Sequence, residues 1–345
     1  MSGSLPREFV ELMAIVRGYQ RSRAVTVAAE LGIADLLSSG PRGVADLAAE
    51  TSADASSLYR LLRALAAAGV LTEHPDRQFG LSAMGEFLRR DHPLSLAAAA
   101  RMFGADYQWR AWGALGHSVE TGENAAVHVL GTDVWEYRRQ HPEHSEVFDA
   151  AMRTLSAADN PGVLAAHDFG RYRLVADIGG GTGAVLAAVL AAHPGSRGIL
   201  FDQAHVVANA EVVLRDAGVA DRAAVVPGDF FDRVPEGADA YLLVRILHDW
   251  EDADAVRILR NVRAAMTPDA VLVIVDSVLG PPNEDPLAKF LDLMMLVSAG
   301  GRERTEEEWR ALLADGGLEF VAAQRATATR HVIEARPMRV VGRSR

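Results

Sequence analysis

The C-terminal half of the chain alternates short apolar segments with helical ones, and this alternation limits the fold more than any other feature. From Tyr172 onward, five apolar segments of strand length are separated by segments of helical period, and two more apolar segments close the chain. Parallel strands need long crossovers, usually helices, and strands buried on both faces are apolar throughout. The pattern predicts a doubly wound α/β domain of mostly parallel strands that ends in an antiparallel hairpin.

The first strand of this domain leads into a glycine-rich loop. The sequence VADIGGGTGAV, residues 175–185, places Asp177 near the end of the strand and four glycines among residues 179–183. Such a loop lets the backbone approach a ligand and turn into a helix. It also matches the dinucleotide pattern G-x-G-x-x-A, with Asp202 at the distance of a ribose-binding acid. The residues therefore leave S-adenosylmethionine and NAD open, although a carboxylate at Asp177 suits a cationic ligand better than a pyrophosphate.

Four longer motifs resemble those of the S-adenosylmethionine-dependent small-molecule O-methyltransferases of plants and bacteria. That family includes the plant caffeic-acid and hydroxyindole enzymes and bacterial enzymes that tailor aromatic polyketides. The motifs are LVADIGGGTGAV, GILFDQAHVV, VVPGDFFDRVPEGADAYLLVRILHDWEDADAVRILRNVRAAM and SAGGRERTEEEWRALLADGGL. The resemblance covers nearly the whole chain. It implies a Rossmann-like catalytic domain, an intimate homodimer formed through the N-terminal domain, and methyl transfer to a phenolic or related hydroxyl.

Three regions are expected along the chain. Residues 1–100 predict a mainly helical, winged-helix-like dimerisation domain, residues 101–168 a helical connector that contributes to the acceptor pocket, and residues 169–345 the Rossmann-like catalytic domain. In the first region, a helix starting near Asp54 or Ser56 places several leucines on one face. A winged helix can read DNA, but residues 1–100 carry ten basic against eleven acidic residues, which is poor for groove binding. Dimerisation is the favoured role.

The resemblance also implies a set of cofactor contacts. The glycine loop would hold the methionine part, and Asp202 would bind the ribose hydroxyls. Asp229 and Phe230 would border the adenine. In the plant pattern a lysine lies four residues before the histidine of HDW, but this chain has Val244 there, and Arg245 beside it is the candidate substitute. With Asp177, the predicted cofactor-binding residues are Gly179, Gly181, Gly183, Asp202, Asp229, Phe230 and Arg245.

A histidine is the expected general base. Methyl transfer from a sulfonium to oxygen is an in-line displacement, so the enzyme must align the reactants and remove the hydroxyl proton. His248, in LHDW, corresponds to the base of the resembled family, and Asp276 and Glu303 occupy the two acidic positions around it. A carboxylate on the second ring nitrogen fixes the tautomer of such a base. Thr305 and Glu308 form a capping box, which leaves Glu303 without a structural role. Asp249 is interpreted as the cap of the following helix, with a place in the acceptor pocket as the alternative.

Aromatic and methionine side chains are the candidates for the acceptor pocket. Methionine repacks readily around flat ligands, and tryptophan and phenylalanine supply apolar walls. The candidates are Trp109, Phe148 and Met152 in the connector and Met294 and Met295 in KFLDLMMLVSAGG. Ordinary packing remains the alternative for each.

Composition narrows the partners and the compartment. The formal net charge of −11 disfavours a nucleic-acid partner, and the absence of cysteine excludes thiolate metal sites. No metal site is expected, because His141 and His144 have no third ligand nearby in the sequence. No segment approaches the roughly 20 apolar residues of a membrane span, and no signal peptide is recognised, which predicts a soluble cytoplasmic protein.

These observations predict an S-adenosylmethionine-dependent O-methyltransferase that methylates a phenolic hydroxyl of an aromatic secondary metabolite, with His248 as general base. The arginine- and alanine-rich, lysine-poor composition is typical of high-GC bacteria and favours an acceptor from antibiotic-type biosynthesis. Two alternatives stay open. The same fold can have drifted to N-methylation, decarboxylation or hydroxylation, or the chain can be a ligand-responsive winged-helix regulator.

Overall fold

The computed structural model describes residues 5–338, and the chain divides into two compact units. The first unit comprises Met1–Trp109 and His141–Leu155, and the second comprises Arg110–Gln140 and Ser156–Arg345. The division falls inside the long helix α11 (Pro142–Ala166), which therefore contributes residues to both units. The extreme ends of the predicted domains, residues 1–4 and 339–345, lie outside the described residues.

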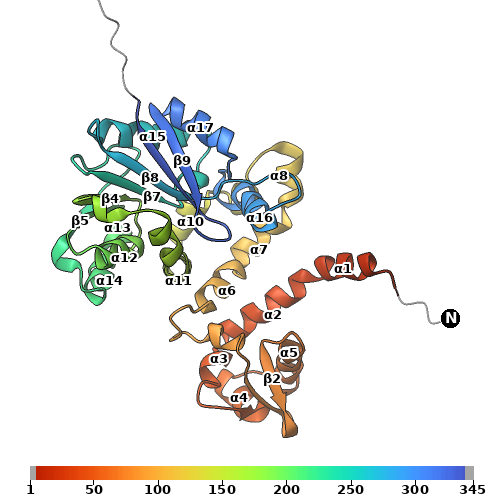
Figure 1. Ribbon diagram of the computed structural model, residues 1–345. Coiled ribbons are helices and arrows are strands. Elements are labelled where there is room, and N and C mark those ends of the chain that lie inside the picture. Colours follow the sequence, from red (N-terminus) through yellow and green to blue (C-terminus); the bar gives the residue numbers. More distant parts are fainter. Residues whose placement is uncertain (1–4, 339–345) are drawn as a thin grey trace, which may run out of the picture. The chain divides into compact units, whose positions relative to one another are not determined.

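The first unit is mainly helical and carries one small sheet (Figure 1). Strand β3 lies between β1 and β2 and is antiparallel to both. The elements of this unit, besides the first half of α11, are α1 (Arg7–Val16), α2 (Gly18–Glu30), α3 (Ile33–Leu36), β1 (Arg42–Gly43), α4 (Val44–Thr51), α5 (Ala55–Ala67), β2 (Leu71–His74), β3 (Gln78–Leu81), α6 (Ala97–Phe103) and most of α7 (Asp106–Gly113).

Helix α5 shows how the sequence builds the core of the first unit. Asp54 is its N-cap, as expected, and accepts a hydrogen bond from the Ser57 N–H at 2.8 Å. Such a cap satisfies one of the amide groups left free at a helix start. The leucines at 58, 62 and 65 then lie on one face and are buried in a cluster with residues of α3, α4 and β3.

The second unit holds a seven-stranded sheet of order β6-β5-β4-β7-β8-β10-β9. Its first five strands in this order are parallel, and β10 is antiparallel to both β8 and β9. The predicted mixed α/β fold with a mostly parallel sheet is therefore confirmed. The strands are β4 (Leu174–Ile178), β5 (Arg197–Asp202), β6 (Ala223–Pro227), β7 (Ala240–Val244), β8 (Val271–Asp276), β9 (Leu318–Arg325) and β10 (His331–Pro337).

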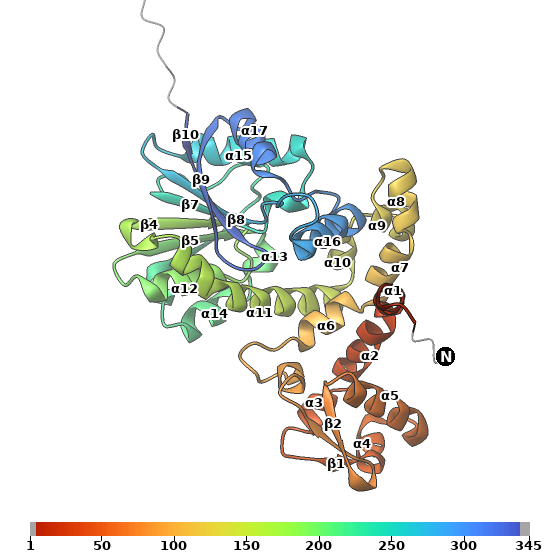
Figure 2. The ribbon, with the colours of Figure 1, turned by 45° about the vertical axis from the view of Figure 1, so that its right-hand side comes forward.

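Helices cover both faces of this sheet (Figure 2). Alternate residues of β8 enter different cores: Leu272 and Ile274 pack with α15 and α17, whereas Val273 and Val275 share a core with α12, α14 and the end of α11. Burial on both faces explains why the strands are apolar throughout. The helices of this unit, besides the second half of α11, are α8 (Leu115–Thr121), α9 (Ala125–Leu130), α10 (Val134–Gln140), α12 (Ala184–Ala192), α13 (Ala204–Val207), α14 (Ala210–Asp216), α15 (Asp252–Ala265), α16 (Pro286–Met294) and α17 (Glu306–Asp315).

The helices of the described residues include none with the length and apolar character that a membrane crossing requires.

Candidate active site

The predicted functional residues of the second unit gather where the parallel strands end. Asp177 is the penultimate residue of β4, and Asp202 and Asp276 are the last residues of β5 and β8. His248 lies four residues beyond β7, in the short 3₁₀ turn Leu247–Asp249. In doubly wound sheets the carboxyl ends of the strands form the ligand-binding edge. The topology thus brings the side chains at positions 177, 202, 248 and 276 to one edge of the sheet.

The glycine loop is shaped by close approaches of its neighbours. Gly179 has φ +70°, and a Cβ there would lie 2.6 Å from Ile246 Cδ1 and 3.4 Å from the Phe230 ring. Gly181 has φ +60° and donates its N–H to Asp202 Oδ2 at 2.9 Å. Glycine alone adopts these backbone angles without strain. Phe230 therefore borders the loop, and Asp202 orders it from the next strand.

Asp177 lies beneath this loop as a buried and unbalanced charge. It is 1% exposed, and neither of its oxygens accepts a hydrogen bond of normal geometry from the described residues. Burial, together with the negative charge of Asp202, raises the pKa of Asp177 to about 7, although the Leu186 amide acts in the opposite direction. Burial also raises the pKa of Asp202 itself. A cationic group bound at this loop would relieve the cost of ionising Asp177.

Two other predicted cofactor residues have partners within the protein. Asp229 Oδ1 accepts a hydrogen bond from the Phe231 N–H at 2.8 Å. Arg245 has φ +56° and is directed toward α11, where it donates to the Ser156 hydroxyl and lies 3.5 Å from Asp159 Oδ2. Burial and the neighbouring Arg330 lower the pKa of Arg245 to about 10. In this structure the Arg245 guanidinium is engaged by α11.

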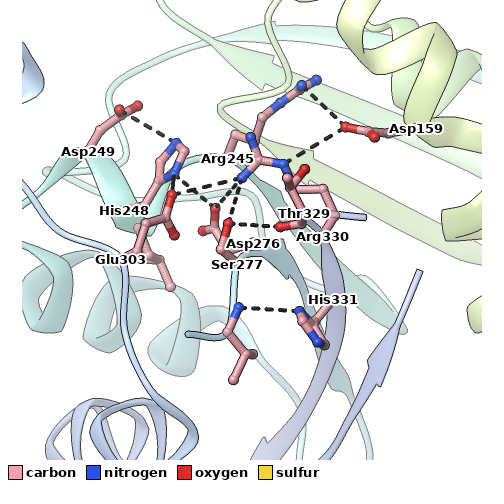
Figure 3. Close-up of polar contacts among 12 residues, drawn as sticks. Asp159, Arg245, His248, Asp249, Asp276, Ser277, Glu303, Thr329, Arg330 and His331 are labelled. Carbon is pink, nitrogen blue, oxygen red and sulfur yellow. Dashed lines mark hydrogen bonds and ion pairs between the residues drawn. The ribbon is translucent and has the colours of Figure 1, made fainter. Parts of the chain in front are cut away.

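His248 is the centre of a buried acidic group (Figure 3). Its Nδ1 lies 2.7 Å from Glu303 Oε1 and 3.4 Å from Asp276 Oδ1, and its Nε2 lies 3.6 Å from Asp249 Oδ1. His248 is 4% exposed, and the acids at 276 and 303 are buried. The carboxylates thus occupy both sides of the imidazole, with the short hydrogen bond on the Nδ1 side.

The surrounding charges set the proton affinity of this imidazole. Burial by itself lowers the pKa of His248, but the carboxylates of Asp276, Glu303 and Asp249 outweigh it and raise the pKa to about 9. Burial raises the pKa of Asp276 to about 6. Burial acts in the same direction on Glu303, but the charge and hydrogen bond of His248 prevail and hold the pKa of that carboxyl below its ordinary value. Glu303 is therefore the ionised partner of the histidine.

Asp249 does not cap the following helix, so that prediction is wrong. Helix α15 begins at Asp252 with Glu251 as N-cap, and the Glu251 side chain makes no capping hydrogen bond. Trp250 is extended, with φ −122° and ψ 143°, and separates the 3₁₀ turn from the helix. This insertion leaves Asp249 in the turn, where it faces the Nε2 side of His248.

Arg304 fixes the turn that carries His248. Its guanidinium is 1% exposed and donates to the Leu247 carbonyl at 2.9 Å, the Trp250 carbonyl at 3.0 Å and the Asp252 carboxylate at 2.8 Å. Because Arg304 directly follows Glu303, one short segment supplies both the acid on Nδ1 and the clamp on the turn. The predicted capping box of Thr305 and Glu308 is confirmed and starts α17 just after this segment.

Three residues that no sequence pattern singled out also belong to this group, namely Asp159, Arg304 and Arg330. Arg330 precedes β10 and lies 3.9 Å from Asp276 and 4.0 Å from Glu303, and Asp159 of α11 lies 3.8 Å from it. No local pattern marks an isolated arginine in ATATRHV as buried. The signal available was indirect, namely that the closing hairpin must lie beside β8.

The predicted acceptor residues fall in both units. Phe148 and Met152 pack with Ala99, Met102 and Ala151 in a small core of the first unit. Trp109 of α7 belongs to the same unit and is half-buried. In the second unit, Met294 ends α16 and is half-buried, and Met295 is buried and begins a π-helical turn, Met295–Ala299. Such turns are frequent at functional sites.

Among the described residues, His248, Asp276 and Glu303 are also a group whose nitrogen and oxygen atoms lie within 4.8 Å of one another. One imidazole and two carboxylates can in general hold a divalent ion. Here the short hydrogen bond from His248 and the guanidinium of Arg330 occupy the same carboxylates. We therefore interpret the three residues as an acid–base group.

Comparison with known proteins identifies the family. The family described as O-methyltransferase domain matches residues 112–319, and that described as O-methyltransferase dimerisation domain matches residues 13–91. The chain belongs to the O-methyltransferase family. The predicted enzyme class, an S-adenosylmethionine-dependent O-methyltransferase with an N-terminal dimerisation domain, is confirmed.

Individual relatives of this O-methyltransferase extend over nearly its whole length. A phenazine O-methyltransferase from Lysobacter antibioticus is 40% identical over 338 residues, covering 98% of both chains. An 8-amino-8-demethylriboflavin N,N-dimethyltransferase from Streptomyces davaonensis is 43% identical, covering 96% of this chain and 98% of the relative. A solved O-methyltransferase from neocarzinostatin biosynthesis, in complex with S-adenosylmethionine and 2-hydroxy-5-methyl naphthoic acid, has a TM-score of 0.79 and 35% identity, covering 92% of this chain and 96% of that one.

Proposed function

We propose that this O-methyltransferase methylates a phenolic hydroxyl of an aromatic secondary metabolite and that His248 is its general base. The observation that carries the proposal is the buried His248 with Nδ1 held by Glu303 at 2.7 Å. A carboxylate on Nδ1 fixes the tautomer that leaves Nε2 to accept a proton, and it stabilises the imidazolium that forms.

The residues around the glycine loop fit the cofactor. Among residues 5–338, the buried carboxylate of Asp177 has no cationic partner, and the backbone at Gly179 leaves no room for a Cβ. S-adenosylmethionine supplies an electrophilic methyl group and a positive charge that suits such a site. We assign the loop glycines at 179, 181 and 183 to its methionine part, Asp202 to the ribose hydroxyls, and Asp229 with Phe230 to the adenine border. Arg245 stays a candidate contact of this part of the site.

The side chains around His248 have distinct roles in this mechanism. His248 Nε2 takes the hydroxyl proton, which is needed because a phenol of pKa about 10 is mostly protonated near neutral pH. Glu303 and Asp276 stabilise the imidazolium from the Nδ1 side. Asp249 lies on the Nε2 side, 3.6 Å away, where it can accept a hydrogen bond from an acceptor hydroxyl. The pKa of about 9 predicts that kcat/KM rises with pH up to that value.

The three predicted regions of the chain have different roles. The N-terminal 100 residues form the homodimer. The connector up to residue 168 carries the acceptor candidates Trp109, Phe148 and Met152. Residues 169–345 bind the cofactor and carry the acceptor candidates Met294 and Met295. The matched dimerisation domain supports the dimer. We place the enzyme in the cytoplasm, with a small aromatic acceptor and without a nucleic-acid or membrane partner. Relatives named for phenazine and naphthoate substrates support the aromatic acceptor.

Replacing His248 by Ala tests the base. We expect kcat toward a phenolic acceptor to fall by roughly 10² to 10⁴, the usual contribution of a general base, while calorimetry finds the affinity for S-adenosylhomocysteine nearly unchanged. His193→Ala is the matched control, because His193 lies at the C-cap of α12, far along that helix from the glycine loop. Methylation that continues at nearly the parental rate in His248→Ala would rule out the base.

N-methylation is the second candidate chemistry, because one relative is named as an N,N-dimethyltransferase at 43% identity. An amine with a free lone pair needs no base before the attack. An acceptor carrying both a phenol and an aromatic amine separates the two, since mass spectrometry locates the new methyl group. Methylation of nitrogen that is insensitive to His248→Ala would favour this candidate.

A further inference from the structure

The turn between β9 and β10 buries an arginine that the mechanism above does not use. Arg330 is 7% exposed, and its carbonyl accepts hydrogen bonds from the Ala326 and Thr327 amides at 2.9 and 3.1 Å. This hairpin end is placed by the pairing of β10 with β8, in which His331 lies opposite Asp276. The register of the sheet therefore brings Arg330 to the acids beside His248.

Arg330 contacts the acids from the side away from the histidine ring (Figure 3). Its Nη1 lies 3.9 Å from Asp276 Oδ1 and 4.0 Å from Glu303 Oε1, and it donates to the Ser277 hydroxyl at 3.3 Å. Its Nε lies 3.8 Å from Asp159 Oδ2. One guanidinium thus lies within 4.0 Å of both carboxylates that flank His248 Nδ1.

Two buried carboxylates beside one nitrogen create an electrostatic conflict. Nδ1 makes its short hydrogen bond with Glu303, and neither oxygen of Asp276 accepts a hydrogen bond from the described residues. Like charges at such distances push one carboxyl toward the protonated form. A guanidinium, which does not lose its proton in proteins, is the group that can keep both acids ionised.

The other charges that face this pair do not remove the conflict. Asp249 faces the histidine from the 3₁₀ turn and adds a third negative charge. Arg245 is directed toward α11, where it pairs with Asp159. Besides His248 itself, Arg330 is therefore the positive group within 4.0 Å of Asp276 among the described residues.

We propose that Arg330 is a positioning residue that keeps Asp276 ionised beside Glu303, so that both carboxylates are present when His248 takes the proton. This inference rests on the proposed role of His248 as base. Burial raises the pKa of Asp276 to about 6 even though His248 and Arg330 lower it, so this carboxyl is close to protonation at neutral pH. Loss of a cation at about 4 Å is expected to raise that pKa by about one unit or more, which would leave much of Asp276 protonated at pH 7.

Arg330→Gln tests the proposal by infrared spectroscopy of the cofactor-free enzyme at pH 7.5. We expect a carbonyl band of a protonated carboxyl that the parent lacks and that disappears when Asp276→Asn is added. The same variant should lose about tenfold in kcat, the equivalent of about one pKa unit of charge stabilisation, with S-adenosylhomocysteine affinity within threefold of the parent. Arg330→Lys keeps the charge and should restore most of the rate. Arg336→Gln is the matched control, because Arg336 is an exposed arginine of β10, the strand that Arg330 precedes.

A double-mutant cycle separates charge from packing. If Arg330 acts through Asp276, Arg330→Gln should cost less than threefold in kcat once Asp276 is already Asn, because no carboxyl remains to be protonated. Equal tenfold losses in both backgrounds, or an Arg330→Gln enzyme without the new band, would overturn the proposal. If the variant fails to fold, the infrared spectrum of the parent enzyme tests the proposal. A protonated carboxyl assigned to Asp276 at pH 7.5 would contradict the proposal, and the absence of that band would support it.

The experiment also distinguishes this inference from the proposed function. If His248 is not the base, His248→Ala stays active and Arg330→Gln still shows the band, but kcat does not change. If His248 is the base and Arg330 has no role, His248→Ala loses activity and Arg330→Gln shows neither the band nor the loss.

Discussion

Buried carboxylates occur at two places on the same sheet edge, and the protein treats them differently. At the end of β4, Asp177 is buried, neither of its oxygens accepts a hydrogen bond of normal geometry from residues 5–338, and its pKa is raised to about 7. Around His248, Glu303 is ionised, and both an imidazole and the guanidinium of Arg330 lie within 4.0 Å of it. Within the described part of the chain, Asp177 has no ion-pair partner, whereas the imidazole of His248 and the guanidinium of Arg330 balance Glu303.

The difference separates a ligand site from a reaction site. A group that must bind a cation is best left unbalanced, because the ligand then relieves a cost already present in the free protein. A group that must stabilise a proton during the reaction is best assembled beforehand, since preorganised charges need no rearrangement in the transition state. The following predictions test whether each acid behaves as its surroundings require.

The largest effect on kcat is expected at Glu303, the acid with positive groups beside it. Glu303→Gln keeps an oxygen for His248 Nδ1 but removes the charge, so kcat should fall by about 100-fold, toward the upper end of losses for such supports. Asp276→Asn should cost only about tenfold, because Asp276 lies 3.4 Å from Nδ1 and Glu303 lies 2.7 Å away. Steady-state kinetics at saturating cofactor measure both. Equal losses would show that distance does not rank the two acids.

The second prediction is a gain rather than a loss: replacing Asp177 should raise the free energy of unfolding. Because the pKa of Asp177 is raised to about 7 in the folded protein, its penalty is absent below the ordinary value and grows as pH rises from about 4 to 7. Asp177→Asn removes the charge but still buries an unpaired amide, so we expect the cofactor-free enzyme to gain about 2 kcal/mol above pH 7. The gain should vanish near pH 4. Denaturant unfolding at both pH values measures it, and a variant less stable than the parent at pH 8 would refute the unbalanced charge.

The same variant should bind the cofactor less well. Without the carboxylate, the affinity for S-adenosylmethionine is expected to fall about tenfold, the size of one weakened charge interaction. Asp269→Asn, at an exposed aspartate before β8, is the matched control for calorimetry. Unchanged affinity would mean that the ligand does not use Asp177.

The smallest expected effect is a shift in the pKa of His248 when a cation binds at the glycine loop. A cation bound at the glycine loop should favour the neutral imidazole, so the pKa of His248 should fall below about 9 by roughly half a unit. Sinefungin carries an amine in place of the sulfonium, whereas S-adenosylhomocysteine is uncharged at that position. NMR titration of the His248 ring should therefore show a lower pKa with sinefungin than with S-adenosylhomocysteine. The same pKa with both ligands would indicate that the two places are electrostatically independent.

The sequence was sufficient wherever a feature is local. The glycine loop, the acids near the strand ends and the capping box of Thr305 are set by neighbouring residues, and the strand pattern predicted the parallel sheet with its closing hairpin. The start of α15 was misplaced because Trp250 is extended and inserts a break that the run WEDADAVRILRNV does not reveal. Arg330 was missed for a different reason. Its place depends on the pairing of β10 with β8, which joins segments more than 50 residues apart.

The clamp formed by Arg304 has a mechanical consequence. Its guanidinium donates hydrogen bonds to the carbonyls of Leu247 and Trp250 on either side of His248, and its neighbour Glu303 is hydrogen-bonded to the imidazole. Base and acid are therefore parts of one rigid body, joined through two adjacent residues of a single segment. If this edge of the sheet shifts when ligands enter or leave, the pair travels together and its spacing is conserved. Acceptor-binding residues elsewhere in the chain can then diverge without changing the distance between His248 and Glu303 on which proton transfer depends.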